Sequence, residues 1–225
     1  MKPDPKQKPE RKEHLMKMKK LLAALLSLAM LLSVSAAAAE VDTAAALTTY
    51  EKFEETAFIA EIPDSIMYVT MNSPEDAPLY TLLAQVGYTY DAFREFMSAN
   101  KVVAYGLFLT DYETEFQVAA DYIEANLDLT GADDATLQAY LTMAGAGLEG
   151  IGATIVESGL YKGKNYNGFW FHYTVEANGA LQSVIQYSIL HSDRAINIRA
   201  YNMSGEYPPE AETLIQLIFD SVIVN

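Results

Sequence analysis

The chain has 225 residues, no cysteine and a formal net charge of −15, from 15 Lys or Arg and 30 Asp or Glu. The lack of cysteine excludes disulfide bonds and the acylated cysteine that anchors a bacterial lipoprotein. The acidic balance argues against binding to nucleic acid or to an anionic membrane surface, because like charges repel.

Residues 1–39 have the order of a secretory signal peptide. A basic stretch over 1–20 precedes an apolar stretch over 21–35, and the small residues that follow fit an A-x-A cleavage site at Ala39. We therefore expect cleavage near Ala39 and a protein that is secreted or associated with the cell surface. An uncleaved anchor stays open as the alternative, because the apolar run is close to the length of a membrane span.

Cleavage would make the remaining chain more acidic. Residues 40–225 keep seven Lys or Arg and 27 Asp or Glu, a net charge of −20. The simplest explanation is solubility outside the cell, and cations would be attracted only diffusely. We expect this part to be a monomer with no membrane span. The start of translation stays open between Met1, Met16 and Met18.

The polar, Ala-rich segment 40–56 is predicted to be an N-terminal lead-in with some helix, ahead of a single globular domain over 57–225. The segments 57–63 and 66–72 have the composition of short strands. Because Asp64-Ser65 separates them, we expect a hairpin.

Two short helices should follow. Ser73 is suited to cap the first helix, with Pro74 at its first position. In the second helix, three apolar side chains repeat at helical spacing: Phe93, Phe96 and Met97.

The remaining elements alternate between strands and helices. The segments 101–110 and 114–121 are predicted to be an antiparallel pair, and Thr130 with Asp133 resembles a capping box at the start of a longer helix. Four strands follow, separated by turn signals, over 153–161, 164–176, 180–191 and 194–203. A closing helix begins at Pro208-Pro209. This order predicts an α+β fold, an antiparallel sheet with helices on both faces.

The pattern resembles the PsbP-like family of α-β-α sandwich proteins. The matching positions are Phe58, Glu61, Ile62, Pro63, Gly163, Lys164, Tyr166, Phe171, Tyr173, Gln186, Tyr187, Asp220, Ser221 and Val222. The resemblance covers most of residues 57–223. It implies a non-enzymatic binding or assembly module, and it supplies no catalytic motif to carry over.

The stretch NGFWFHYTVE holds the only Trp of the chain, Trp170, and His172 two residues later. Alternation along a strand places Phe169, Phe171 and Tyr173 on one face and Trp170 and His172 on the other. We favour core packing for both faces, because Trp is highly buried on average. The functional alternative is an aromatic platform for a sugar ring or a peptide, with these candidate binding residues: Trp170, His172, Tyr166 and Tyr161.

No motif predicts a metal or a cofactor. Asn126, Asp128 and Thr130 match the first ligand positions of a calcium loop, but Leu137 occupies the position of its essential Glu, so we reject the site. A pairing of His172 with Ser188 on the next strand would resemble part of a catalytic triad only by chance.

We therefore expect an exported, non-catalytic binding or assembly domain. Its partner would be an unidentified protein or cell-envelope component. Two alternatives stay open: a secreted carbohydrate-active hydrolase that uses a carboxylate pair, and a carbohydrate-binding module that uses exposed aromatic side chains.

Overall fold

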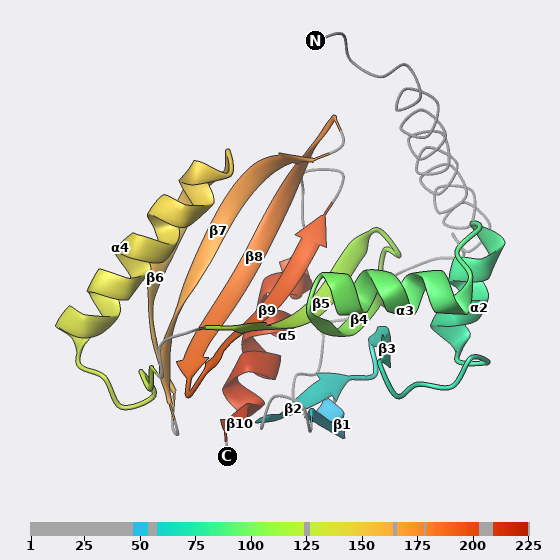
Figure 1. The fold of residues 1–225 in the computed structure, drawn as a ribbon, viewed down its shortest axis with the longest axis horizontal. Helices are drawn as coiled ribbons and strands as arrows, with labels where there is room; N and C mark the ends of the chain where they lie inside the picture. The colour runs from blue at the N-terminus through green and yellow to red at the C-terminus, as the bar shows by residue number, and fades with distance from the viewer. Residues whose placement is uncertain are drawn as a thin grey trace, which may run out of the picture.

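The fold is an α+β arrangement built on a seven-stranded antiparallel sheet (Figure 1), which confirms the predicted fold class. The computed structural model describes residues 47–53, 58–123, 127–163, 166–177, 179–202 and 209–224. The predicted signal peptide and its cleavage site lie outside these residues.

The large sheet has the strand order β3-β4-β5-β9-β8-β7-β6. Its strands are β3 Ile66–Thr70, β4 Val102–Phe108, β5 Thr114–Tyr122, β6 Thr154–Lys162, β7 Asn167–Ala177, β8 Ala180–His191 and β9 Arg194–Asn202. The last four strands form a meander, and β9 then pairs with β5, which comes from the first half of the chain. The strands β5, β9 and β8 are therefore the centre of the sheet.

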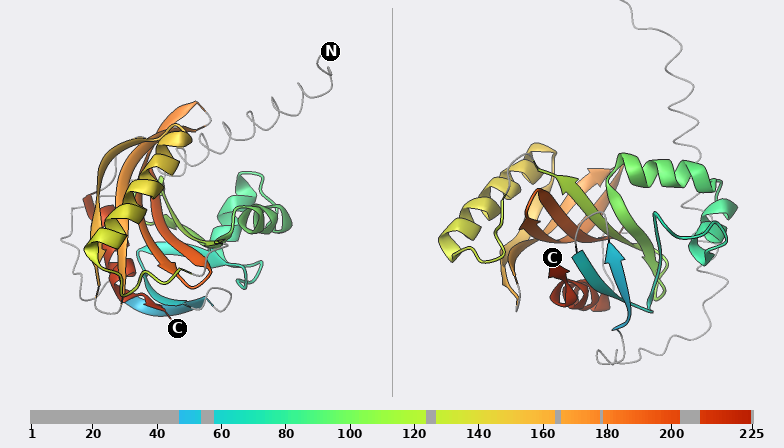
Figure 2. Two further views of the ribbon diagram at one scale, coloured as in Figure 1. Left: turned by 60° about the vertical axis from the view of Figure 1, so that its left-hand side comes forward. Right: turned by 60° about the horizontal axis from the view of Figure 1, so that its bottom comes forward.

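One face of the large sheet is closed by a helix and a smaller sheet. These elements are α5 Pro209–Ser221, β1 Leu47–Phe53, β2 Phe58–Pro63 and β10 Ile223–Val224. The apolar side of α5 packs on β2, β8 and β9, and the core between them contains fully buried side chains such as Phe116, Ile198 and Phe219. The right panel of Figure 2 shows α5 and the small sheet on the side of the large sheet away from α3 and α4.

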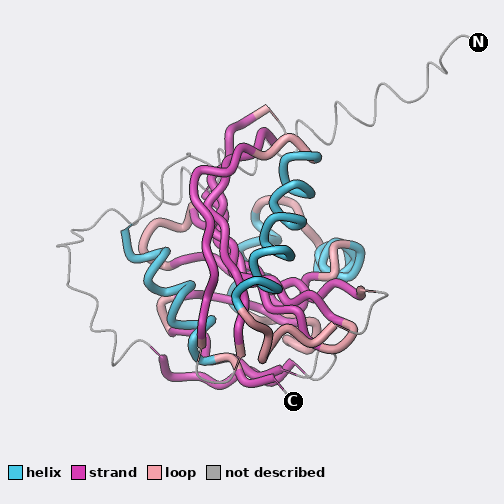
Figure 3. Tube along the Cα trace, turned by 90° about the vertical axis from the view of Figure 1, so that its left-hand side faces the viewer, coloured by secondary structure: helices cyan, strands magenta, loops and turns pink. Residues whose placement is uncertain are grey.

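In the described part of the chain, the other face is covered only at its two ends. The helices on this side are α2 Pro78–Gln85, α3 Tyr90–Ala99 and α4 Asp134–Gly150. The first two pack on β3 and β4 around Phe93 and Met97, and α4 packs on β6 and β7 around Leu141 and Phe171. Figure 3 shows the sheet between α4 on one side and α5 on the other.

The hairpin predicted at Asp64-Ser65 is wrong. Strand β2 pairs with β1 and β10 in the small sheet, whereas β3 pairs with β4 in the large one. The turn therefore carries the chain from one sheet to the other. The two edges of β2 pair with β1 and β10, and the alternation of residues within 57–72 gives no sign of these partners.

The predicted helical content of the lead-in is also corrected, because residues 47–53 form strand β1. Helix α2 begins at Pro78 rather than Pro74, and the Ser73 hydroxyl accepts a hydrogen bond from the Thr70 N–H at 2.8 Å instead of capping the helix. Both Pro74 and Pro78 are suited to the first position of a helix, and the sequence pattern alone did not show which of them begins α2.

Candidate functional site: the central polar face

Polar side chains gather on the part of the sheet that lies between α3 and α4. We call this surface the central polar face, and its residues are Glu115, Gln117, Gln186, Ser188, Asn197, Arg199 and Tyr201. Gln117 and Gln186 lie opposite Arg199 on either side of it, and Ser188 lies opposite Asn197. In Figure 1, β8 and β9 run between α4 and α3 with no helix drawn across them on this side.

The register explains why these side chains share a face. Successive strand residues point to opposite sides, so Phe116, Ile198 and Ile185 enter the core beneath α5 while their neighbours point the other way. Central strands with one apolar and one polar side are expected where only one face of a sheet is covered.

A chain of hydrogen bonds connects the buried members of the face. The Arg199 Nε–H donates to Gln186 Oε1 at 2.9 Å, and the Gln186 amide nitrogen donates to Ser188 Oγ at 3.0 Å and to Asn197 Oδ1 at 3.2 Å. Ser188 Oγ donates to Asn197 Oδ1 at 2.7 Å. Each bond fixes the orientation of the next side chain, so the network holds these side chains in one arrangement.

Arg199 supplies a positive charge near the centre of this face. Its side chain is half-buried, and its Nη1 lies 3.2 Å from the Tyr201 hydroxyl. Burial lowers the pKa of the guanidinium, but the nearby Tyr201, Tyr173 and Asp121 together raise it above its ordinary value, so Arg199 is charged. No carboxylate of the described residues lies within ion-pair distance of it.

Glu115 lies on the side of the face nearer α3. Burial raises the pKa of the Glu115 carboxyl above its ordinary value, and hydrogen bonding to Tyr105 and Gln117 opposes part of that rise. Desolvation disfavours the charged form of a carboxyl. Arg199 and Glu115 thus give the face one fixed positive charge and one carboxylate that ionises less readily than usual.

The aromatic candidates from the sequence lie on the opposite face of the sheet, toward α5. Tyr166 is buried and its hydroxyl donates to the Phe219 carbonyl, while the Tyr161 hydroxyl donates to the Asp220 carboxylate. Trp170 and His172 are half-buried, with ring centroids 5.1 Å apart, and Trp170 also stacks on Tyr187. The structure thus brings these four side chains together around α5.

His172 and Ser188 are not neighbours in the way a triad requires. His172 lies opposite Ile185 and points toward α5, where its Nε2 is 3.7 Å from a Glu212 carboxylate oxygen. Ser188 points to the central polar face on the other side of the sheet. The two side chains therefore lie on opposite faces of the sheet and cannot pair.

The described residues of the rejected calcium loop make hydrogen bonds with one another. The Asp128 carboxylate accepts hydrogen bonds from the Thr130 N–H, at 3.0 Å, and from its hydroxyl, which lower the Asp128 pKa. Helix α4 is capped by Asp133, whose carboxylate accepts from the Thr136 N–H at 2.8 Å, so Thr130 is not the cap. Asn126 lies outside the described residues, and within those residues no cluster of metal ligands is found.

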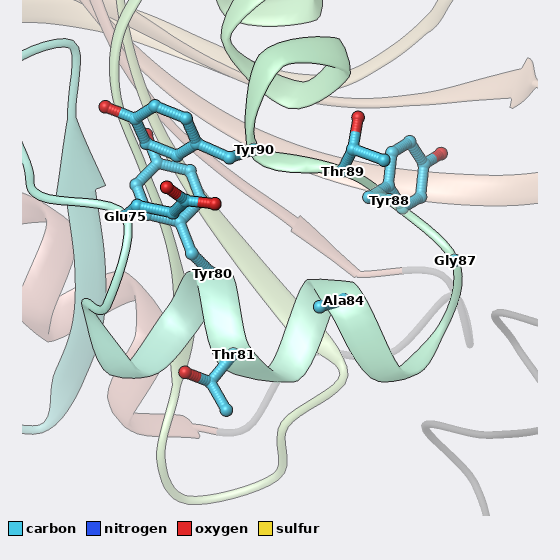
Figure 4. A pocket seen from close by; sticks show the side chains of 8 residues that line it. All are labelled: Glu75, Tyr80, Thr81, Ala84, Gly87, Tyr88, Thr89 and Tyr90. Carbon is cyan, nitrogen blue, oxygen red and sulfur yellow. The ribbon is translucent and has the colours of Figure 1, made fainter.

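A separate surface pocket of about 480 Å³ lies where α2 turns into α3 (Figure 4). Three tyrosines contribute to its lining: Tyr80, Tyr88 and Tyr90. Tyr80 is buried and packs edge-on against Tyr90 with centroids 4.8 Å apart, and Figure 4 shows Glu75 beside this pair. Glu75 is the only carboxylate among the described residues that line the pocket, and they do not include the carboxylate pair expected of a glycoside hydrolase.

Comparisons with known proteins give similarities of fold only. No protein-family model matches the chain, and no curated protein matches it in sequence. The solution structure of cyanobacterial PsbP from Synechocystis is similar with a TM-score of 0.46 and 11% identity, over 86% of this chain and 99% of that one. The PsbP-like resemblance seen in the sequence thus has a weak structural counterpart.

Two other solved structures are similar at a lower level. A Pseudomonas aeruginosa protein of unknown function has a TM-score of 0.39 and 11% identity, over 79% of this chain and 96% of its own. A Bacteroides thetaiotaomicron protein has a TM-score of 0.38 and 8% identity, over 75% of this chain and 45% of its own. Similarities of this size identify no function, because one fold serves many.

Sequence reasoning missed the central polar face. The signal was present as alternating polar residues in three separate strands, for example Gln186 and Ser188 in one and Asn197 and Arg199 in the next. Alternation in a single strand predicts only a solvated side. The pairing of β5 with β9, which no local pattern reveals, was needed to bring the three sets together.

Proposed function

We propose that this chain is an exported binding domain without catalytic activity of its own, and that its protein or cell-envelope partner docks on the central polar face. The observation that carries the proposal is the hydrogen-bonded order of a surface that no helix of the described residues covers. Gln186, Ser188 and Asn197 are buried and held by these hydrogen bonds, and they support the half-exposed Arg199. Ordering side chains before contact lowers the entropic cost of binding. The signal-like order of residues 1–39 supports export.

The shape of the fold adds a second argument. Stability comes from the core beneath α5 and from the packing of α2, α3 and α4 at the two ends of the opposite face. The central polar face is therefore available for recognition without disturbing a hydrophobic core. In the described part of the chain no helix is both long and apolar enough to cross a membrane.

Site-specific crosslinking tests the docking face. A photo-reactive amino acid replaces Gln117 on the face, and in a matched control it replaces Gln216, an exposed glutamine on α5 at the other side of the molecule. Each protein is incubated with envelope and medium fractions of the producing cell. We expect a discrete adduct through position 117 that excess unlabelled protein competes away. No adduct at 117, or equal adducts at 117 and 216, would contradict the proposal.

N-terminal sequencing tests export. The full chain expressed in a bacterial host should appear outside the cytoplasm with a new N-terminus close to Glu40. Retention of residues 1–39 on an exported, membrane-bound product would instead support the uncleaved anchor. A product that stays in the cytoplasm would overturn export altogether.

Carbohydrate binding is the second candidate function, and the pocket between α2 and α3 favours it. Aromatic rings beside a polar opening are suited to stack on sugar rings, and here Tyr88 is half-exposed while Tyr90 accepts a hydrogen bond from Arg94 at 2.6 Å. Titration with a panel of soluble glycans should show binding that Tyr88→Ala weakens at least about tenfold. Binding that is unaffected by this change would remove the pocket from consideration.

A further inference from the structure

We propose that Arg199 recognises the C-terminal carboxylate of a polypeptide partner. The inference rests on the proposed function, since it names the chemistry of the docking face. It follows from the direction of the hydrogen bonds, the position of the charge and the acidity of the rest of the chain.

The hydrogen-bond direction is set by Arg199, because a guanidinium can only donate. Gln186 must turn its oxygen to Arg199, so its nitrogen donates onward to Ser188 and Asn197. Asn197 Oδ1 accepts two hydrogen bonds, from Gln186 and Ser188, so the Asn197 amide nitrogen points away from these two side chains. The network of hydrogen bonds therefore has a donor group at each end, the Arg199 guanidinium at one and the Asn197 amide nitrogen at the other.

Both sets of donors lack a protein acceptor among the described residues. The Arg199 Nη2 group and the Asn197 Nδ2 group donate to no described side chain or backbone carbonyl, and neither nitrogen is fully buried without a partner. A surface that offers donors beside a positive charge fits an oxygen-rich anion. The planar fork of a guanidinium fits a carboxylate with two parallel hydrogen bonds.

The charge of the surroundings selects the kind of anion. The chain carries a formal net charge of −15, and Glu115 and Asp121 lie on the same face of β5 as Gln117, the neighbour of Arg199. Ligands with several negative charges are repelled by this field, whereas a single carboxylate on a neutral or basic body is not. This excludes polyphosphates and acidic polysaccharides as the favoured occupants.

The position of Arg199 favours a chain end over a side chain. Arg199 is half-buried on a face that is flanked by α3 and α4, so a ligand must reach in from outside. A terminal carboxylate can enter end-on, and its last peptide groups can pair with the half-buried amide of Gln117. A side-chain carboxylate brings its whole backbone across the face instead.

An NMR titration of the isotopically labelled protein tests the inference directly. The probes are N-acetylglycylglycine, its C-terminal amide, and the α-amide of N-acetylglutamate, which carries only a side-chain carboxylate. We expect the first probe to shift the Arg199 Nε–H and Asn197 amide signals saturably, with a Kd on the order of 1–10 mM for so small a ligand. The C-terminal amide should give no saturable shift.

Three variants separate recognition from folding. Arg199→Gln should abolish the shift, and Arg199→Lys, which keeps the charge without the fork, should weaken binding at least about tenfold. Arg194→Gln, a change at the start of the same strand where the arginine pairs with Asp193, should bind as the wild type does. Near-ultraviolet circular dichroism checks that each variant is folded. If Arg199→Gln does not fold, the affinity of Arg199→Lys for the first probe is the deciding measurement.

Several results would overturn the inference. Equal binding of the acid and its amide, undiminished binding by Arg199→Lys, or equal binding of the glutamate probe would each exclude the terminal carboxylate. Failure of the proposed docking face can be distinguished from failure of this inference. In the first case, N-acetylglycylglycine would bind while crosslinking through position 117 gave no adduct. If crosslinking through 117 persisted in Arg199→Gln, the docking face would stand and the carboxylate assignment would fall.

Discussion

The two faces of the large sheet come from the same strands and have opposite properties. Toward α5, the central strands contribute Phe116, Ile198 and Ile185, which are at most 1% exposed. On the other side, their sequence neighbours form the central polar face, where Arg199 and Gln117 stay half-exposed. One face is closed by packing and the other is organised by hydrogen bonds. The comparison indicates that stability and recognition are divided between the two sides of one sheet.

Truncation at the closed face should give the largest effect. Phe219 of α5 is fully buried, and three tyrosine rings surround it within 5.2 Å of its centroid: Tyr161, Tyr166 and Tyr187. We expect Phe219→Ala to lower the free energy of unfolding by about 3–5 kcal/mol in urea titrations. The control is Phe96→Ala, at a ring 38% exposed, which should cost far less. Equal costs would show that the closed face is not the main source of stability.

A close approach between β7 and β8 gives the next effect. A Cβ at Gly168 would lie 2.4 Å from the Ser188 carbonyl oxygen and 3.3 Å from the Phe219 ring. Gly168→Ala should therefore cost about 1–3 kcal/mol through overpacking. Gly147→Ala, in an exposed part of α4 with open space around its Cβ, should stabilise by about 0.5–1 kcal/mol. Thermal unfolding measures the stability of both variants relative to the wild type. If Gly168→Ala left the stability unchanged, the tight packing around Gly168 would be contradicted.

On the polar face, removal of one hydrogen-bonding group should cost less than truncation of the core. Gln186→Leu leaves Arg199 Nε and Asn197 Oδ1 with fewer partners and should cost about 1–3 kcal/mol. Gln182→Leu is the matched control, because Gln182 lies on the same strand and face but makes no side-chain hydrogen bond within the described residues. If both changes cost the same in urea unfolding, the network contributes nothing specific.

The smallest effect concerns pH. Since burial raises the pKa of Glu115 in the folded state, the folded protein holds this proton more tightly than the unfolded chain. The contribution of Glu115 to stability is therefore highest at low pH and is lost as pH rises from its ordinary value of 4.5 to the raised one. Glu115→Gln should gain stability relative to the wild type between pH 3 and pH 7. A gap that is constant across this range would contradict the raised pKa.

Local patterns predicted most elements but not how they assemble. The period-two segments became β4 to β9, and Phe93 and Met97 became the buried side of α3 as their spacing indicated. The hairpin after β2 failed because β2 pairs with β1 and with β10 near the chain terminus. The proposed caps Ser73 and Thr130 failed because each hydroxyl finds a hydrogen-bond partner in a local turn.

The candidate site was less predictable than the fold. Trp170 and His172 attracted attention because their residue types are rare in this chain, yet both lie against the core beneath α5. Arg199 sits in an ordinary alternating strand, and nothing in its neighbours along the chain marks it. Its importance depends on Gln117 and Gln186, 82 and 13 positions away in the sequence, which lie opposite it on either side.

The sequence by itself determined the α+β class, the amphipathic helices and the period-two strands, because periodicity is a property of neighbouring residues. Only the tertiary structure decided which strands are neighbours, and therefore which polar residues meet around Arg199. The physical reason is that strand pairing is set by long-range burial and backbone hydrogen bonding, and a single strand's alternation is compatible with many partners.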